Sequence, residues 1–277
     1  MLSRGGRHDT FSSVVYVGRA PVTISSAIVL FITAFIGSTI NAVAGGGSFL
    51  TLPTLIFTGI APISANATST VALWPGSLAS VGAYRQDIAG ERKLLVALGI
   101  TSLVGGIFGA IVLLRTNQST FVHLLPYLLL LATVLFAFSD PLITRLRQGR
   151  PVAKTAGLMT IVGMCALQFV IAFYGGYFGG GIGIMMLAGL SLMGLRNIHQ
   201  MNALKTVLAS CINGVAVLIF IIARVVAWPQ AVVMLVAAIV GGYGGAYYAR
   251  KLDPRYVRGA VIAIGVGMTL WFFTHQG

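Results

Sequence analysis

The sequence contains little charge, and acidic residues are almost missing from it. Of its 277 residues, 8% are Asp, Glu, Lys or Arg, and only five are Asp or Glu. An ordinary soluble domain has roughly 25% charged residues. Residues 20–84 and 155–195 contain no charged side chain, and each stretch is longer than the ~20 apolar residues that span a bilayer. These absences exclude a water-soluble globule and predict a polytopic membrane protein.

The usual sequence patterns of enzymes and metal sites are also missing. The two cysteines, Cys165 and Cys211, lie in apolar stretches and form no Cys-x-x-Cys pattern, so they indicate neither a disulfide framework nor a metal site. The histidines are scattered, and the sequence has no His-Glu-x-x-His motif, paired carboxylates, nucleophile elbow or phosphate-binding loop. We therefore expect no enzyme activity, no cofactor, no metal and no ATP-driven transport by this chain alone.

The excess of basic residues has two explanations. Lys and Arg number 18 and the formal net charge is +13, which would suit a surface that binds nucleic acid. Cytoplasmic loops of membrane proteins also carry an excess of Lys and Arg, and we prefer this second explanation. The sequence therefore predicts contact with the lipid bilayer and no binding of nucleic acid.

The apolar runs predict an all-α fold in which two helices are short. At about 1.5 Å per residue, the segment 48–59 covers only ~18 Å of a ~30 Å hydrocarbon core. The segment 182–194 is similarly short, and both follow three consecutive glycines, where the chain breaks, turns or re-enters. The sequence leaves open whether the chain crosses the membrane eight or ten times. The ten expected segments are 22–43, 48–59, 65–84, 94–114, 122–139, 156–178, 182–194, 202–223, 230–249 and 257–273.

Two matched motifs indicate two homologous repeats of four to five helical segments each. Asn66-Ala-Thr-Ser-Thr-Val71 shares Asn, Ala, Thr and Val with Asn202-Ala-Leu-Lys-Thr-Val207, and the glycine triplet at 45–47 recurs at 179–181. Such self-similarity is the signature of a duplicated unit. We expect a mobile N-terminal tail (1–21), a first repeat (22–140), a basic inter-repeat loop (141–155) and a second repeat (156–277).

The positions of the basic residues predict inverted repeats with both termini outside. If all ten segments cross, most Lys and Arg residues fall on one face, and positive charge belongs on the cytoplasmic face. If the glycine hairpin does not cross, the repeats are parallel and the basic cluster at 250–258 faces outward. We prefer the inverted arrangement. Its cytoplasmic loops are 85–93, 141–155, 195–201 and 250–258.

Glycines spaced four residues apart occur in both halves, as Gly105 with Gly109 and as Gly241 with Gly245. This spacing places two positions without side chains on one face of a helix. We expect another helix to approach each pair closely.

Lys205 is the ionisable residue that stands out inside an apolar segment. A charged side chain within hydrocarbon costs roughly 2.5–3.5 kcal/mol on insertion scales, and no acid lies near Lys205 in the sequence. Lys205 could reach the headgroup region from the start of its helix, or an anionic ligand could neutralise it. Asn202, three residues earlier, lies on the same helix face and favours the second alternative.

Neutral polar groups complete the candidate site for a small anionic substrate. The first-half counterparts of Asn202 and Lys205 offer neutral donors, and the glycine triplets leave backbone N–H groups accessible at helix ends that attract anions. Asn41, Gln168 and Asn213 could bind substrate or join two helices. Besides Lys205 and Asn202, the candidate residues are Asn66, Thr68, Ser69, Gly45, Gly46, Gly47, Gly179, Gly180, Gly181, Asn41, Gln168 and Asn213.

These motifs carry a resemblance to a known family. Asn41-Ala-Val-Ala-Gly-Gly-Gly-Ser-Phe-Leu-Thr-Leu-Pro53, then Ala65-Asn-Ala-Thr-Ser69, with the triplet and Asn-x-x-Lys recurring later, resembles the sulfite exporter TauE/SafE family of anion transporters. The resemblance covers about 22–273. It implies a multi-pass permease of the bacterial inner membrane, built from a duplicated unit, for sulfite, sulfonates or other organosulfur anions. The second copy departs from the pattern by having Leu204 and Lys205 in place of Thr and Ser.

The expected function is therefore secondary transport of a small anion. The sequence does not identify the anion, the direction, the coupling ion or the oligomeric state. We expect the site at the interface of the repeats near mid-membrane, with alternating access between its two sides. One alternative is an anion channel or passive facilitator, which the lack of a proton-relay carboxylate favours. Another is a membrane-embedded enzyme or assembly factor in which Lys205 is structural.

Overall fold

In the part of the chain that it describes, the computed structural model consists of helices. It describes residues 21–83, 92–138, 145, 158–195, 197–249 and 254–275. The expected all-α fold is confirmed, and the two short helices, α2 and α8, directly follow the glycine triplets. The helices of the described residues are α1 (Ile24–Ala44), α2 (Ser48–Phe57), α3 (Pro62–Ala83), α4 (Arg92–Arg115), α5 (Gln118–Ala137), α7 (Leu158–Tyr177), α8 (Ile182–Leu192), α9 (Ile198–Ile222), α10 (Trp228–Ala249) and α11 (Pro254–Thr274).

Local sequence signals explain where several helices begin. Pro62 and Pro254 are the first residues of α3 and α11, where the missing N–H costs nothing because first-turn N–H groups have no acceptor within the helix. Thr23 precedes α1, and its hydroxyl accepts a hydrogen bond from the N–H of Ser26, as an N-cap residue does. These signals place the helix starts within a few residues of the predicted ones.

The outer surface of the protein is apolar over most of the helices. Large side chains such as Ile28, Phe108 and Leu131 are exposed, and an apolar surface of this extent suits lipid better than water. By length and composition, four described helices could cross a membrane, over Ile24–Asn41, Leu94–Arg115, Gln118–Ala137 and Gln200–Ile222. The surface is that of a multi-pass membrane protein.

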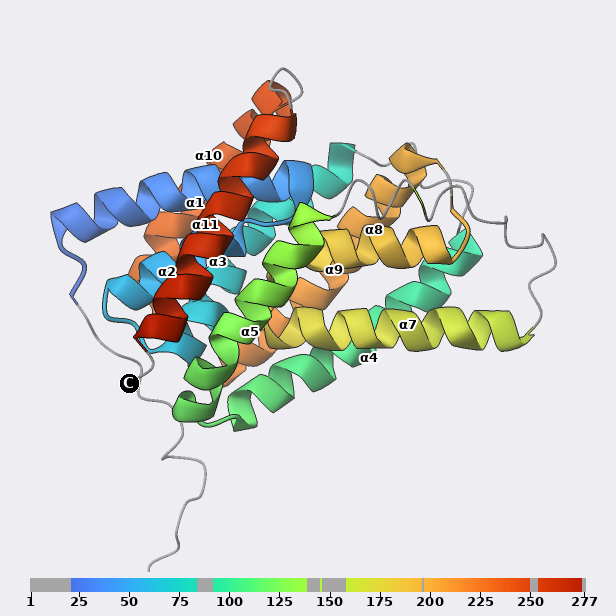
Figure 1. Cartoon of the computed structure of the whole chain (residues 1–277), viewed down its shortest axis with the longest axis horizontal. Helices are drawn as coiled ribbons and strands as arrows, with labels where there is room; N and C mark the ends of the chain where they lie inside the picture. The colour runs from blue at the N-terminus through green and yellow to red at the C-terminus, as the bar shows by residue number, and fades with distance from the viewer. Residues whose placement is uncertain are drawn as a thin grey trace, which may run out of the picture.

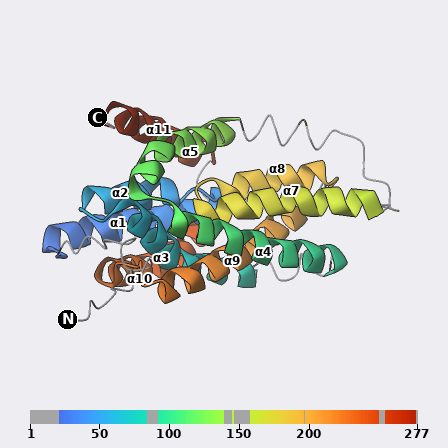
Figure 2. The same ribbon diagram turned by 90° about the horizontal axis from the view of Figure 1, so that it is seen from below.

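The helices form layers. In Figure 2, α5 and α11 lie together on one side, and α3, α4, α9 and α10 lie on the other, with α1, α2, α7 and α8 between them. Figure 1 shows α1 and α2 at one end of the molecule and α7 and α8 at the opposite end. Helices α1 and α7 run from these ends toward the middle, and both glycine triplets therefore lie near the centre.

Glycines allow the closest helix pairs to form, between α1 and α10 and between α4 and α7. A β-carbon at Gly105 would lie 2.7 Å from the β-carbon of Ala172 in α7, which is too close for any side chain. A β-carbon at Gly241 in α10 would likewise clash with the backbone of Phe35 in α1. These contacts confirm the predicted packing role of Gly105 and Gly241, whereas the surroundings of Gly245 fall outside the described residues.

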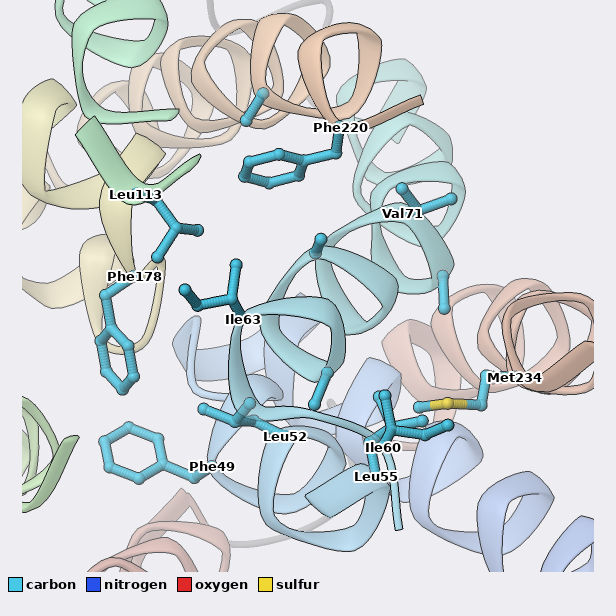
Figure 3. Packing of buried hydrophobic residues seen from close by; sticks show 14 of the residues in the cluster. Phe49, Leu52, Leu55, Ile60, Ile63, Val71, Leu113, Phe178, Phe220 and Met234 are labelled. Carbon is cyan, nitrogen blue, oxygen red and sulfur yellow. The ribbon is translucent and has the colours of Figure 1, made fainter. Parts of the chain in front are cut away.

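The main buried cluster holds both short helices to one core. Phe49 is part of α2, and Phe178 lies next to the second triplet, yet both belong to this cluster. Figure 3 shows how residues from several helices converge on it. Those labelled there are Phe49, Leu52, Leu55, Ile60, Ile63, Val71, Leu113, Phe178, Phe220 and Met234. The two glycine breaks are therefore fixed relative to each other by packing.

Candidate functional site

Both glycine triplets end a long helix in the same way. Gly45 has φ +78°, and its N–H donates to the carbonyls of Asn41 and Ile40. Gly179 also has φ +78°, and its N–H donates to the carbonyl of Tyr174. Glycine adopts this left-handed conformation without the strain that a β-carbon introduces. Each triplet therefore acts first as the stop of α1 or α7.

The first break lies directly against the start of α8. A β-carbon at Gly45 would lie 2.9 Å from the α-carbon of Gly183, so the two halves meet there through backbone alone. The remaining triplet residues are also tightly surrounded. Gly46 lies against the ring of Phe136, Gly47 against the Gly37 carbonyl, Gly180 against the ring of Phe178 and Gly181 against Ala132.

A small cavity of about 40 Å³ lies beside this junction. A single water needs roughly 10–15 Å³ by the same measure, so the cavity has room for a few water-sized groups or one small polyatomic ion. Its walls come from α1, α3, α8 and α9. The lining residues are Asn41, Gly45, Ser77, Ile182, Gly183, Lys205, Thr206, Ala209 and Asn213.

Lys205 places a positive charge in the wall of this cavity. Its side chain is only 6% exposed, and among the described residues no hydrogen-bond or ion-pair partner of its ammonium group is found. The acids Asp9, Asp87, Glu91, Asp140 and Asp253 all lie outside the described residues. The described helices therefore offer Lys205 no carboxylate.

Neutral hydrogen-bond donors line the same cavity as Lys205. The side-chain nitrogen of Asn41 donates to the hydroxyl of Ser77 at 3.0 Å, which uses one of its two hydrogens. In the first turn of α8 the N–H groups of Ile182 and Ile184 have backbone acceptors, whereas none is found for Gly183 among the described residues. This free N–H belongs to a helix N-terminus, where the backbone favours negative charge.

Four of the predicted site residues line the cavity, namely Asn41, Gly45, Lys205 and Asn213. Asn202 does not line it, although its backbone carbonyl accepts a 2.7 Å hydrogen bond from the hydroxyl of Thr206, which does. The structure therefore brings the end of α1, the start of α8 and the middle of α9 together at one cavity.

Other predicted residues join helices instead. Asn66 donates to the carbonyl of Tyr177 at 3.1 Å. The hydroxyl of Thr68 accepts from the N–H of Ala227 at 3.0 Å. Ser69 and Thr51 share a 2.6 Å hydrogen bond between hydroxyls. Gln168 donates to the hydroxyl of Ser102 at 2.7 Å, which ties α7 to α4.

Five lining residues were not among the predicted ones: Ser77, Ile182, Gly183, Thr206 and Ala209. Helix periodicity could have found two of them, because Lys205, Ala209 and Asn213 are spaced four apart on one face and Thr206 adjoins it. The repeat could have found Ser77, which lies as far after Asn66 as Asn213 lies after Asn202. No sequence signal indicates that the start of α8 reaches the first break.

Comparison with known proteins supplies the family context. Residues 30–272 match the sequence profile of the family described as Sulfite exporter TauE/SafE. A protein of Haemophilus influenzae described as a probable membrane transporter protein is 28% identical over 258 residues, covering 92% of this chain and 98% of that protein.

Two further relatives carry similar descriptions. The probable membrane transporter protein YfcA of Escherichia coli K12 is 28% identical over 265 residues, covering 94% of this chain and 93% of its own length. The probable membrane transporter protein ORF9 of Sinorhizobium sp is 23% identical over 241 residues, covering 87% of this chain and 90% of its own. No solved structure gives a significant match to the chain.

Proposed function

The chain belongs to the sulfite exporter TauE/SafE family and is a membrane transporter, and from this premise we propose that it carries small anions. The observation that carries the proposal is the buried ammonium group of Lys205 in the wall of a cavity. A charge removed from water needs an opposite charge beside it. Because the described residues contain no Asp or Glu, a bound anion is the natural partner of Lys205.

The substrate we propose is sulfite, a sulfonate or another organosulfur anion. The family description names sulfite, and a cavity of about 40 Å³ suits a compact head group. Asn41, Asn213, Gly183 and Lys205 all line the cavity, and each can donate a hydrogen bond. Donors on several sides match a group that carries its charge on several oxygens.

We further propose that 22–140 and 156–277 are inverted repeats joined by the basic loop 141–155, with 1–21 as an N-terminal tail. The helix contacts support this arrangement, because α1 packs on α10 as α7 packs on α4, and α3 packs on α10 as α9 packs on α4. Figure 1 also supports it, because α1 and α7 run toward the middle of the molecule from opposite ends. Broken helices in inverted repeats are typical of secondary transporters.

The position of the cavity between the two halves supports alternating access as the mechanism. Asn41 and Ser77 belong to the first half, whereas Lys205 and Asn213 belong to the second. The halves cross at Trp74, whose indole N–H donates to the carbonyl of Ser210 at 3.0 Å. Rocking of one half against the other about this crossing changes which side the cavity faces.

We propose the bacterial inner membrane as the location. The relatives in Haemophilus influenzae and Escherichia coli are bacterial proteins described as membrane transporters. The basic loops then face the cytoplasm, in agreement with the usual distribution of positive charge.

Counterflow in proteoliposomes tests the function. Purified protein is reconstituted in liposomes loaded with excess unlabelled sulfite, and labelled sulfite is added outside. A transporter accumulates the label transiently above its outside concentration, because the unlabelled substrate leaves through the same alternating site. A channel or passive facilitator shows equilibration only. Failure of every sulfur oxyanion and sulfonate to enter contradicts the proposal, provided that the protein remains folded.

A further inference from the structure

The candidate cavity contains one ionisable side chain. Of its nine lining residues, Lys205 alone carries charge, and the others are Asn, Ser, Thr, Gly, Ile or Ala. Lys205 is also the one charged side chain among the buried residues that the structure describes. The side chains of Arg115 and Arg224, at the ends of α4 and α9, are exposed. No second positive charge therefore faces the cavity from the described residues.

Other titratable groups on the surrounding helices lie away from the cavity. Cys165 and Tyr174 belong to α7, and Cys211 belongs to α9, but none of them lines the cavity. The residues that α1, α3 and α8 contribute to the lining are not titratable. The charge of the occupied site is therefore the charge of Lys205 plus that of the substrate.

A substrate with a single negative charge makes this sum zero. A substrate with two negative charges leaves one charge unpaired in a region away from water, and an unpaired buried charge is strongly unfavourable. A neutral solute leaves the ammonium group of Lys205 unpaired instead. The electrostatic balance therefore favours one class of solute, the monoanions.

The neutral donors are too few to compensate a second negative charge. Asn41 already gives one amide hydrogen to Ser77, and the hydroxyl of Thr206 donates to the carbonyl of Asn202. The remaining donors are the second amide hydrogen of Asn41, the amide of Asn213 and the N–H of Gly183. These groups can orient an oxyanion, but they supply no further positive charge.

We infer that the site selects substrates by charge and accepts monoanions, so that Lys205 and the bound substrate form a neutral pair while the site changes the side that it faces. This inference rests on the proposed function. Sulfite then enters the site as hydrogensulfite, and sulfonates enter in their ordinary singly charged form. Sulfate and the sulfite dianion are rejected although they are of similar size.

Uptake by proteoliposomes at several pH values tests this charge rule. Sulfite changes from hydrogensulfite to the dianion within the accessible range of pH, whereas methanesulfonate keeps one negative charge throughout. At fixed total concentration, the initial rate for sulfite is expected to fall about tenfold per pH unit above its second ionisation. The rate for methanesulfonate reports any titration of the protein itself, so the ratio of the sulfite rate to the methanesulfonate rate is the quantity expected to fall with rising pH.

Competition by two tetrahedral oxyanions of similar size separates charge from shape. Perchlorate, with one negative charge, is expected to inhibit methanesulfonate uptake at least tenfold more strongly than sulfate, with two. Equal inhibition by perchlorate and sulfate overturns the inference, as does a sulfite rate that is constant with pH or that falls in parallel with methanesulfonate. Equal transport of dianions and monoanions would contradict this inference but not the proposed function. Transport of no anion at all would contradict both.

Discussion

Asn66 donates a 3.1 Å hydrogen bond to the backbone carbonyl of Tyr177, at the end of α7. A helix of the first half thereby holds the broken helix of the second half. At the corresponding position of α9, the side chain of Asn202 has no hydrogen-bond partner among the described residues. The Asn of the first motif therefore joins two helices in this conformation, whereas the matching Asn of the second motif does not.

This difference predicts unequal effects of the same substitution. Asn66→Leu leaves the buried carbonyl of Tyr177 without its partner, and such a loss typically costs about 1–3 kcal/mol. We expect a clearly lower unfolding temperature for the purified variant. Asn202→Leu is the matched control and should unfold close to wild type. Equal unfolding temperatures of the two variants would show that the contact between Asn66 and Tyr177 contributes nothing.

The second prediction concerns the first glycine break. Gly45 has φ +78° and lies against the α-carbon of Gly183. In Gly45→Ala, the left-handed conformation costs roughly 1–2 kcal/mol, and the β-carbon forces α8 away from the cavity. We expect reduced anion uptake at normal membrane insertion. Gly163→Ala on α7 is the control, because a β-carbon there meets nothing within 4 Å, and its uptake should be unchanged.

The third prediction separates a lining residue from a residue that joins helices. Asn213 lines the cavity, whereas Gln168 is buried between α7 and α4 and bonds to Ser102. Asn213→Leu should weaken anion binding several-fold with little change in stability. Gln168→Leu should lower stability and leave the affinity of the folded protein unchanged. The unfolding temperature and the anion affinity are measured on both variants. Loss of affinity in Gln168→Leu with loss of stability in Asn213→Leu would show that the two roles are exchanged.

Much of the fold follows from the sequence because hydrophobicity and helix boundaries are local properties. The uncharged runs and the proline at the start of α3 are visible in the sequence, and the shortness of α2 follows from its glycine triplet. The contact between Gly45 and Gly183 could not be predicted, since it joins residues far apart in the chain and leaves no trace in composition.

The site was less accessible to prediction, for a related reason. Lys205 stands out because buried charge is costly, so the sequence marks it directly. Asn66, Thr68 and Gln168 carry the same polar groups as ligand-binding residues. Only the position of the neighbouring carbonyls and hydroxyls reveals that they join helices, and this depends on packing between distant segments.

The fourth prediction concerns topology. We expect the loop 141–155 to be cytoplasmic because it is basic; apart from Arg145, this loop lies outside the described residues. In a background with Cys165 and Cys211 replaced by serine, single cysteines are introduced as Gln148→Cys and Asn117→Cys. A membrane-impermeant thiol reagent should label position 117 in intact cells and should label position 148 only after permeabilisation. Labelling of position 148 from outside would reject the inverted arrangement.

The most direct test of the account is anion binding by Lys205→Met, which keeps the apolar stem of the side chain and removes its charge. Truncating one partner of a buried charge pair typically costs 2–5 kcal/mol. We therefore predict binding of the transported anion that is ~30-fold or more weaker, in a protein that folds at least as well as wild type. Lys205→Arg should be intermediate, because the charge is kept but the donor geometry changes.

The control is Arg115→Met, which removes an exposed cation at the end of α4 and should bind the anion normally. The measurement is the dissociation constant by isothermal titration calorimetry, together with the unfolding temperature of each variant. The account predicts a large loss of affinity in Lys205→Met at undiminished stability. Wild-type affinity in well-folded Lys205→Met would contradict the role of Lys205 as the counter-charge of the substrate.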